Sequence, residues 1–251
     1  MQIVIIGSGN VASVLGRLCK QNGHQVLQVI SRNAQHAKML AEELACDHGD
    51  YEAEINKQAE LYLVAVADTA LFDLNKNFNL DNKLILHTAG SVSKDVLQNV
   101  SVNYGVLYPL QSLRKEMQYA NDIPLLVDGN TEETTTLIAD FAASLSCRVS
   151  KANDEQRLKL HVAAVVVSNF TNHLYALAEE FCNKEGVDFG LLAPLILETA
   201  GRVQKSSPSA VQTGPAIRND IFTIDKHLRV LTEHPKLKYI YIKLTDSIMQ
   251  G

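Results

Sequence analysis

The strongest constraint on the fold is a short glycine-containing segment close to the N-terminus. The segment reads Gly7, Ser8, Gly9, Asn10, Val11 and Ala12. An apolar run precedes it and a helical pattern follows, which is the setting of the GxGxxA turn in dinucleotide-binding proteins. In such a turn Gly7 permits the tight bend, Gly9 lets the backbone approach a pyrophosphate, and Ala12 lets the helix pack on the strand. A glycine turn that binds nothing is the alternative.

The end of the next apolar run indicates which dinucleotide would bind. The run Val26–Ile30 ends in Ser31, Arg32 and Asn33. Sites for NAD carry an acid about 20 residues beyond the glycines, which binds the ribose 2′-hydroxyl. Arg32 stands there instead and can form paired hydrogen bonds with a 2′-phosphate, to which Ser31 and Asn33 can add others. We therefore expect NADP as the cofactor, and an ordinary surface arginine is the alternative.

Short apolar runs alternate with helical patterns through residues 1–150. The runs are Ile3–Ile6, Val26–Ile30, Leu61–Val66, Leu84–Leu86, Val106–Leu107, Leu125–Val127 and Arg148–Val149. The first five are nearly continuous in apolar residues, as parallel strands covered on both faces are. With helical patterns at Val11–Gln21 and Ala34–Ala45, they predict an α/β domain with a Rossmann-type, doubly wound and mostly parallel sheet.

The strand pattern stops after residue 150, and residues 151–251 are predicted to form an all-α C-terminal domain. Asn153 and Gln156 fit a capping box at the start of a helix. No glycine or proline follows before Gly186, which predicts a helix of about 30 residues that joins the two domains. Further helices are predicted over Leu191–Lys205, Asn219–Leu231 and Leu237–Met249.

Ligands of open α/β sheets bind beyond the carboxyl ends of the strands, so the segments that follow the strands supply candidates. Ala67 and Asp68 follow the third run and can flank the adenosine or the nicotinamide ribose, although Asp68 fits a helix cap equally well. Thr88, Ala89 and Gly90 follow the fourth run. These residues are small enough to let a nicotinamide ring lie close, and a plain strand-to-helix turn is the alternative.

Polar side chains interrupt the long apolar helix. At 3.6 residues per turn, His161, Ser168 and Asn172 share a narrow sector, and Asn169 lies beside it. Histidine is the usual general acid of enzymes at neutral pH, and His161 can donate a proton to a carbonyl or imine as hydride arrives. Asn169 can hold the substrate oxygen. The alternative for His161 is a structural histidine whose hydrogen-bonding groups are satisfied in the core or in an interface.

Three further residues are candidates for substrate chemistry. Tyr108 and Gln111 follow the fifth run and bring a phenol and an amide to the predicted cleft, where Tyr108 is a second candidate proton donor. Arg218 stands in a Gly-Pro loop and can bind a substrate carboxylate through two hydrogen bonds. A structural arginine–aspartate pair is the alternative for Arg218.

Together these segments resemble, along nearly the full chain, the Rossmann-like proteins that carry a DUF2520 domain. They include the GSGNVA turn, Ser31-Arg32, the Tyr-Pro-Leu-Gln segment, the helix with His161 and Asn169, and Thr-Gly-Pro-Ala-x-Arg-x-Asp. That group is described as NADP oxidoreductases and is similar to the "NADP oxidoreductase, coenzyme F420-dependent" family. More distantly, the chain resembles pyrroline-5-carboxylate reductases, ketopantoate reductases and β-hydroxyacid dehydrogenases. The resemblance implies an active site between two domains and a homodimer built through the helical half.

Two positions depart from these relatives, and both bear on the proton donor. β-Hydroxyacid dehydrogenases and ketopantoate reductases carry a catalytic lysine on the long helix, whereas this chain offers His161 and Asn169, with Lys159 nearby. The DUF2520 group often has His-Pro after the fifth strand, whereas this chain has Tyr108-Pro109. No residue of the chain argues for coenzyme F420.

Composition excludes several classes of function. The chain has 251 residues, 46% hydrophobic and 20% charged, which is typical of soluble globular proteins. The net charge of −5 does not indicate binding to nucleic acid or to an anionic membrane surface. No apolar run approaches the length that a membrane span requires. The four cysteines lie far apart, which argues against a metal site and disulfides and favours the cytoplasm.

These observations predict an NADP-dependent oxidoreductase that transfers hydride between NADP(H) and a small carbonyl, imine or hydroxy acid bound between the two domains. The alternative is a non-catalytic NADP-binding sensor or regulatory dimer, whose helical half is mainly a dimer surface. Polar side chains that converge near the nicotinamide in an enclosed pocket would favour the enzyme.

Overall fold

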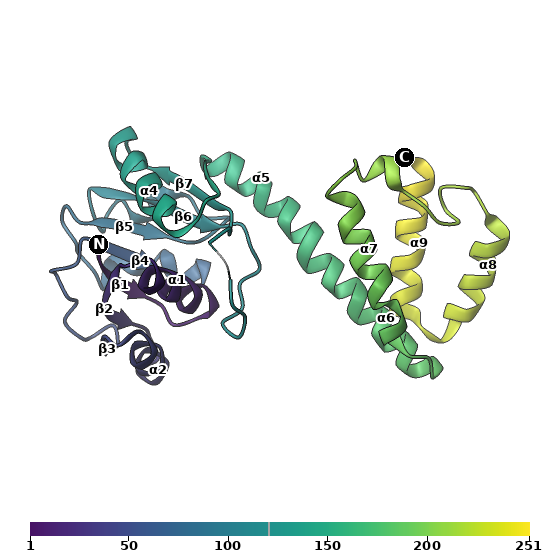
Figure 1. Ribbon diagram of the computed structural model, residues 1–251, viewed down its shortest axis with the longest axis horizontal. Helices are drawn as coiled ribbons and strands as arrows, with labels where there is room; N and C mark the ends of the chain where they lie inside the picture. The colour runs from purple at the N-terminus through teal and green to yellow at the C-terminus, as the bar shows by residue number, and fades with distance from the viewer. Residues whose placement is uncertain (120) are drawn as a thin grey trace. The chain divides into compact units, whose positions relative to one another are not determined.

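The computed structural model describes residues 1–119 and 121–251, and only the backbone of Asn75. The chain divides into two compact units, Met1–Val166 and Val167–Gly251. The first unit contains the sheet and the second is helical (Figure 1). The division falls within the long helical stretch, whereas the sequence placed the domain boundary at residue 150.

The first unit is built on an eight-stranded sheet with the order β3-β2-β1-β4-β5-β6-β7-β8. The strands are β1 (Gln2–Ile6), β2 (Gln25–Ile30), β3 (Asp47–Gly49), β4 (Leu61–Val64), β5 (Leu84–His87), β6 (Asn103–Pro109), β7 (Leu125–Gly129) and β8 (Val149–Lys151). Every neighbouring pair is parallel except β6 and β7, which are antiparallel. The prediction of a mostly parallel, doubly wound sheet is confirmed, and β3 is an addition that the sequence did not reveal.

Both faces of the sheet are covered, which explains the nearly continuous apolar strands. The helices α1 (Asn10–Gln21), α2 (Ala34–Leu44) and α4 (Glu132–Leu145) contribute to one core cluster. The short elements α3 (Asp68–Leu71), η1 (Leu74–Lys76) and η2 (Lys94–Leu97) contribute to the other. Successive strand residues point to opposite faces, so Ile5 enters the first cluster and Val4 the second, and both are fully buried.

The predicted long helix begins and ends where the sequence placed its caps. The Asn153 side chain accepts a hydrogen bond from the Gln156 amide at 2.9 Å, and the Gln156 side chain accepts one from the Asn153 amide at 3.1 Å. The capping box is thus confirmed. At the other end, Gly186 takes the left-handed conformation, with φ of 68°.

A π-helical segment interrupts this helix, which the sequence analysis did not foresee. The order is α5 (Asp154–Ala164), the π-helix η3 (Val165–Phe170) and α6 (Thr171–Glu185). Hydrogen bonds in a π-helix join residues five apart, so the spacing of 3.6 residues per turn does not hold across it. The prediction that His161, Ser168 and Asn172 share a narrow angular sector assumed 3.6 residues per turn throughout. That assumption fails across η3.

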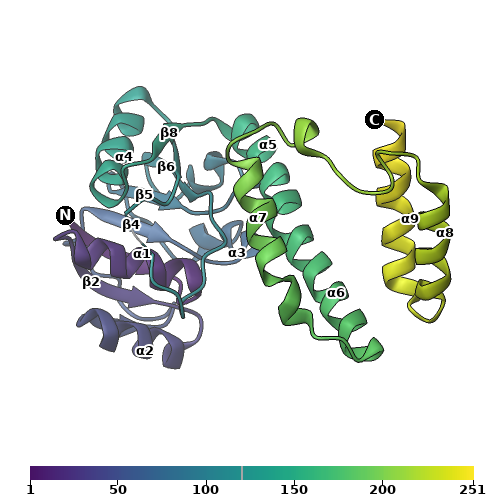
Figure 2. The same ribbon diagram turned by 45° about the vertical axis from the view of Figure 1, so that its right-hand side comes forward.

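In the described part of the chain, the second unit contains helices and no strand. The predicted all-α region is thus confirmed. After α6 come η4 (Phe189–Leu192), α7 (Ala193–Val203), η5 (Ser209–Val211), α8 (Ile221–Val230), η6 (Leu231–Glu233) and α9 (Pro235–Gln250). Within this unit α8 and α9 lie side by side in both views (Figure 1, Figure 2). Over the residues that the structure describes, no helix combines the length and apolar character needed to cross a membrane.

Candidate functional site

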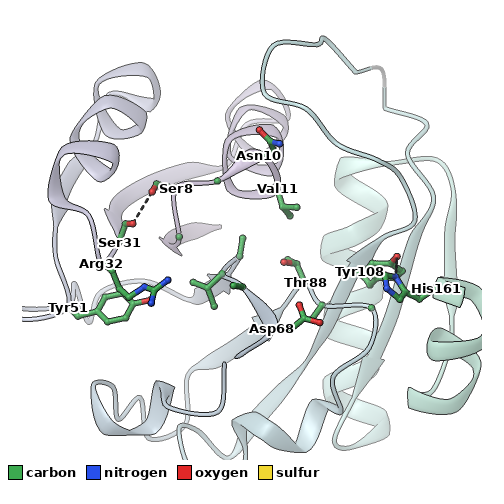
Figure 3. Close-up of a pocket in the computed structure, with 17 residues that line it drawn as sticks. Ser8, Asn10, Val11, Ser31, Arg32, Tyr51, Asp68, Thr88, Tyr108 and His161 are labelled. Atoms are coloured by element: carbon green, nitrogen blue, oxygen red, sulfur yellow. Dashed lines mark hydrogen bonds between the residues drawn. The ribbon is translucent and has the colours of Figure 1, made fainter. Parts of the chain in front are cut away.

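A cavity of about 450 Å³ lies at the carboxyl edge of the sheet in the first unit (Figure 3). Segments that follow β1, β2, β3, β4 and β5 line it, together with one residue each from β6 and α5. The lining residues are Gly7, Ser8, Gly9, Asn10, Val11, Ser31, Arg32, Tyr51, Ala65, Val66, Ala67, Asp68, Thr88, Ala89, Gly90, Tyr108 and His161. Most of the residues predicted for the cofactor thus share one cavity with both candidate proton donors.

The glycine turn shapes the floor of this cavity. Gly7 has a φ of 127°, and a Cβ atom there would lie 2.0 Å from the carbonyl oxygen of Ala65, so no other residue fits. A Cβ atom on Gly9 would meet nothing within 4 Å, which leaves open space above the backbone. The first turn of α1 has no acidic residue and no capping side chain. Its amide groups are therefore available to an anion.

The end of β2 contributes polar groups from Ser31 and Arg32. The Ser8 hydroxyl donates to the Ser31 hydroxyl at 2.8 Å, and the Asn33 amide donates to the same oxygen at 3.4 Å. Arg32 is exposed and lines the cavity, and it forms no ion pair within the described residues. The Asn33 side chain lies outside the cavity lining, because its oxygen caps α2 by accepting from the His36 amide at 3.0 Å.

The residues after β4 and β5 form the middle of the cavity wall. Asp68 is the first residue of α3 and Ala67 is its N-cap, so the alternative reading of Asp68 as a helix cap is wrong. Its carboxylate instead accepts a hydrogen bond from the Ser91 hydroxyl at 2.6 Å. The Thr88 hydroxyl donates to the Val64 carbonyl at 3.3 Å.

Tyr108 and His161, which the sequence offered as separate candidates, form a pair. The Tyr108 Oη and His161 Nδ1 atoms are 2.9 Å apart, and the two rings meet edge to face with centroids 5.9 Å apart. A Cβ atom on Gly90 would lie 2.6 Å from His161 Nδ1 and 2.9 Å from Tyr108 Cζ. The absence of a side chain at Gly90 therefore makes room for the pair. Figure 3 shows the pair at the opposite end of the cavity from Ser8 and Ser31.

The electrostatic setting of Tyr108 favours a protonated phenol. Burial raises the pKa of Tyr108, and the positive charge of Arg157 acts in the opposite direction without reversing that shift. The phenol is consequently uncharged at neutral pH and can donate a hydrogen bond or a proton.

A buried histidine and arginine lie close to the turn that carries Gly90. His87, at the end of β5, is fully buried, and its Nδ1 accepts a hydrogen bond from the Ala89 amide at 3.1 Å. Burial, aided by the charge of Arg157, lowers the pKa of His87 to about 4. Arg157 is 1% exposed and donates to the Val92 carbonyl and, at 2.7 Å, to the Asp154 carboxylate. The contact with Val92 joins α5 to the segment that follows β5, and the contact with Asp154 lies within α5.

Besides Asn33, four predicted site residues do not line the cavity. Ala12 is fully buried, as its predicted packing role requires. Gln111 is exposed in the loop after β6. Asn169 in η3 and Arg218 in the loop before α8 belong to the second unit and are both exposed. Arg218 forms no ion pair among the described residues, so the structural arginine–aspartate pair is not found. The substrate roles of these residues stay predictions.

Sequence reasoning missed one residue of the cavity altogether. Tyr51 lines the cavity from the segment that follows β3. The strand β3 reads Asp-His-Gly and carries no apolar pattern, so nothing in the sequence marked its carboxyl end. Site candidates were expected only after strands with an apolar pattern, so Tyr51, which follows β3, was not among them.

The sheet, the glycine turn and the free arginine at the end of β2 are the features of a dinucleotide-binding Rossmann protein. Residues 123–248 match the family described as "Domain of unknown function (DUF2520)", and residues 2–90 match "NADP oxidoreductase coenzyme F420-dependent". A solved structure from Bacteroides fragilis, described as a "putative NADP oxidoreductase", is 38% identical with a TM-score of 0.93. The match covers 100% of this chain and 98% of that one. The chain belongs to this DUF2520 family of NADP oxidoreductases, and the predicted enzyme class and cofactor are confirmed.

More distant structures share the fold. A reductive aminase from Aspergillus terreus, in complex with NADPH and ethyl levulinate, is 18% identical with a TM-score of 0.72, covering 99% of this chain and 92% of that one. A 1-pyrroline-5-carboxylate reductase from Streptococcus pyogenes is 17% identical with a TM-score of 0.66, covering 100% and 99%. No curated protein matches this sequence.

The buried His87 makes a testable contribution to acid sensitivity. In the unfolded chain its pKa returns to the ordinary value of 6.5, so between pH 6.5 and about 4 the unfolded state binds a proton that the folded state does not. The contribution of His87 to the free energy of unfolding is therefore fully present above pH 6.5. As the pH falls from 6.5 toward 4, the free energy of unfolding decreases by about 3 kcal/mol in total. We expect His87→Gln to lose less stability than the wild type over this interval, as measured by urea unfolding at several pH values.

The matched control is His36→Gln, because His36 is exposed. It should keep the pH dependence of the wild type. If His87→Gln lost as much stability between pH 6.5 and 4 as the wild type, the neutral buried state of His87 would be refuted.

Proposed function

We propose that this NADP oxidoreductase transfers hydride between NADP(H) and a small carbonyl, imine or hydroxy acid bound between domains 1–150 and 151–251. The observation that carries the proposal is the Tyr108–His161 pair, in which two groups able to move a proton lie 2.9 Å apart in the wall of the cavity that the glycine turn also lines. A sensor needs no such pair. The alternative of a non-catalytic NADP-binding dimer is therefore less well supported.

The cavity offers a complementary group for each part of NADP. The pyrophosphate would lie over Gly7 and Gly9 against the amides of α1, because that is where the backbone is open. Arg32, which forms no ion pair among the described residues, would bind the 2′-phosphate, helped by Ser31. The contribution predicted for Asn33 is not supported, because its side chain caps α2 outside the cavity lining. The remaining cofactor contacts would come from Ser8, Asn10, Val11, Ala67, Asp68, Thr88, Ala89 and Gly90. Ala12 would contribute by letting α1 pack on the sheet beneath the turn. The nicotinamide would lie near Gly90, beside the Tyr108–His161 pair.

The chain would supply the proton and hold the substrate. When bound, NADPH supplies the hydride, which the protein needs only to orient. Either Tyr108 Oη or His161 would donate the proton to the substrate oxygen or nitrogen, and the hydrogen bond between the two groups lets one reprotonate the other. Asn169, Gln111 and Arg218 would position the substrate, with Arg218 suited to a carboxylate.

The second unit would form a homodimer with a second copy of the chain. Several of its large apolar side chains are mostly exposed, namely Phe170, Leu191, Leu195, Leu197, Phe222 and Tyr239. A monomer rarely leaves so many apolar groups in water, and a second copy with the same surface could cover them. The four cysteines are free, in keeping with a cytoplasmic location.

The preference for NADP can be tested by titration without knowing the substrate. We expect NADPH to bind at least about tenfold more tightly than NADH, because Arg32 forms charge-assisted hydrogen bonds only with the 2′-phosphate. Arg32→Asp should abolish that preference by repelling the phosphate. Arg148→Asp makes the same change at an exposed arginine outside the cavity and should leave both dissociation constants unchanged. Equal affinities for the two nucleotides in the wild type would contradict the assignment.

The reaction can be tested by following NADPH oxidation with keto acids and imines, and NADP⁺ reduction with hydroxy acids. On a substrate found in this way, His161→Ala and Tyr108→Phe should lower turnover by about 10²–10⁴-fold if each takes part in proton transfer. The affinity for NADPH should change little. His173→Ala, at an exposed histidine of α6, is the control. Full turnover in His161→Ala would exclude it as the donor, and NADPH binding without turnover of any compound would favour the sensor.

The dimer can be tested by sedimentation at several concentrations. We expect a particle of twice the 27.6 kDa chain mass. Leu197→Glu places a charge on a side chain that is 75% exposed in the second unit and should shift the particle toward the monomer. Leu137→Glu, at a 52% exposed leucine of α4, is the control and should not. A wild-type monomer at every concentration would rule out the dimer.

A further inference from the structure

Tyr51 brings an unused hydroxyl group to the cavity. Its ring is partly buried and packs edge to face against Phe78, with ring centroids 5.4 Å apart and an angle of 76° between the planes. This contact restricts the orientation of the ring. The Tyr51 hydroxyl has no hydrogen-bond partner in the part of the chain that the structure describes, although the residue lines the cavity. A fixed ring with a free hydroxyl group is suited to binding a ligand.

Two other donors stand at the same end of the cavity. Figure 3 shows Tyr51 and Arg32 together at the end that holds Ser8 and Ser31. The Arg32 guanidinium has no ion-pair partner among the described residues. The Ser31 oxygen accepts from the Ser8 hydroxyl and the Asn33 amide, which leaves its own hydrogen available. Three side chains thus present hydrogen-bond donors to one space without an acceptor of their own.

Charge at this end also favours an anion. Burial raises the pKa of Tyr51, and the positive charge of Arg32 opposes that shift, so the phenol lies within electrostatic range of the guanidinium. The neighbouring acid, Asp50, accepts hydrogen bonds from the amides of Glu52 and Ala53 at 3.0 and 3.1 Å. Asp68 is the acid of the cavity lining, and its carboxylate is held by Ser91. Neither carboxylate is bonded to Arg32.

We propose that the Tyr51 hydroxyl binds the 2′-phosphate of NADP together with Arg32 and Ser31 and is a determinant of cofactor specificity. The inference rests on the proposed placement of NADP in this cavity. A phosphate carries three acceptor oxygens and nearly two negative charges, so it can use all three donors at once. NAD has a neutral hydroxyl group at the same position, and a hydrogen bond to it contributes much less.

The test is the substitution Tyr51→Phe, followed by fluorescence titration with NADPH and with NADH. Phenylalanine keeps the ring and its packing against Phe78 and removes only the oxygen. We expect the dissociation constant for NADPH to rise about tenfold, because a hydrogen bond to a charged group is lost. The dissociation constant for NADH should stay within about twofold of the wild type, because its 2′-hydroxyl makes only a weak contact.

Tyr104→Phe is the matched control. It removes a phenol hydroxyl that donates to Asp95 at 3.1 Å and is absent from the cavity lining. It should leave both affinities unchanged. A second measurement is the ³¹P resonance of the 2′-phosphate of bound NADP⁺, which should move in Tyr51→Phe and not in Tyr104→Phe.

The outcomes separate this inference from the proposed function. If the wild type prefers NADPH and Tyr51→Phe keeps that preference with an unmoved ³¹P resonance, the role of the hydroxyl is refuted and the assignment of NADP stands. If Tyr51→Phe weakens NADPH and NADH equally, the hydroxyl is not a specificity determinant and the inference is overturned. If the wild type does not distinguish the two nucleotides, the cofactor assignment and this inference fail together.

Discussion

The close approach of Gly7 to the carbonyl group of Ala65 is the contact on which the cavity depends. It brings the turn after β1 against the end of β4, where any side chain at Gly7 would collide with the backbone. The Gly7 amide also donates to the Ile30 carbonyl at 2.7 Å, which ties the same turn to the end of β2. Three strand ends are thereby gathered around the start of α1. The uncapped amides of that helix and the open space above Gly9 then face the same edge.

A second close approach, at Gly90, organises the other end of the cavity. Gly90 follows β5, Tyr108 lies on β6 and His161 on α5, so the pair unites segments far apart in the sequence. The hydrogen bonds from Arg157 to Val92 and from the Lys94 amide to Asp154 join α5 to the segment after β5. They thereby fix the helix face that carries His161, four residues beyond Arg157. The Tyr108–His161 pair is therefore held by packing around a glycine.

Much of this arrangement could be predicted from the sequence, because buried strands and capped helices leave periodic patterns. The glycine turn, Arg32 and the capping box at Asn153 follow local rules that one segment satisfies by itself. The strand β3 could not be found, since its side chains are not buried and carry no apolar pattern, and Tyr51 was missed with it. The π-helix η3 was equally hidden, because an apolar run does not encode a change from α to π hydrogen bonding.

The two ends of the cavity differ in what they can recognise. One end presents hydrogen-bond donors and a positive charge from Arg32, Ser31 and Tyr51, which suits a phosphate. These groups do not distinguish one substrate from another. The other end carries Tyr108 and His161, which can give or take a proton and so suit many carbonyl and imine substrates. These groups do not distinguish NADP from NAD. In the proposed function, cofactor choice and proton transfer would thus be carried out at opposite ends of one cavity. Under the proposed function neither end would select the substrate, and that role is proposed for Asn169 and Arg218, which are both exposed.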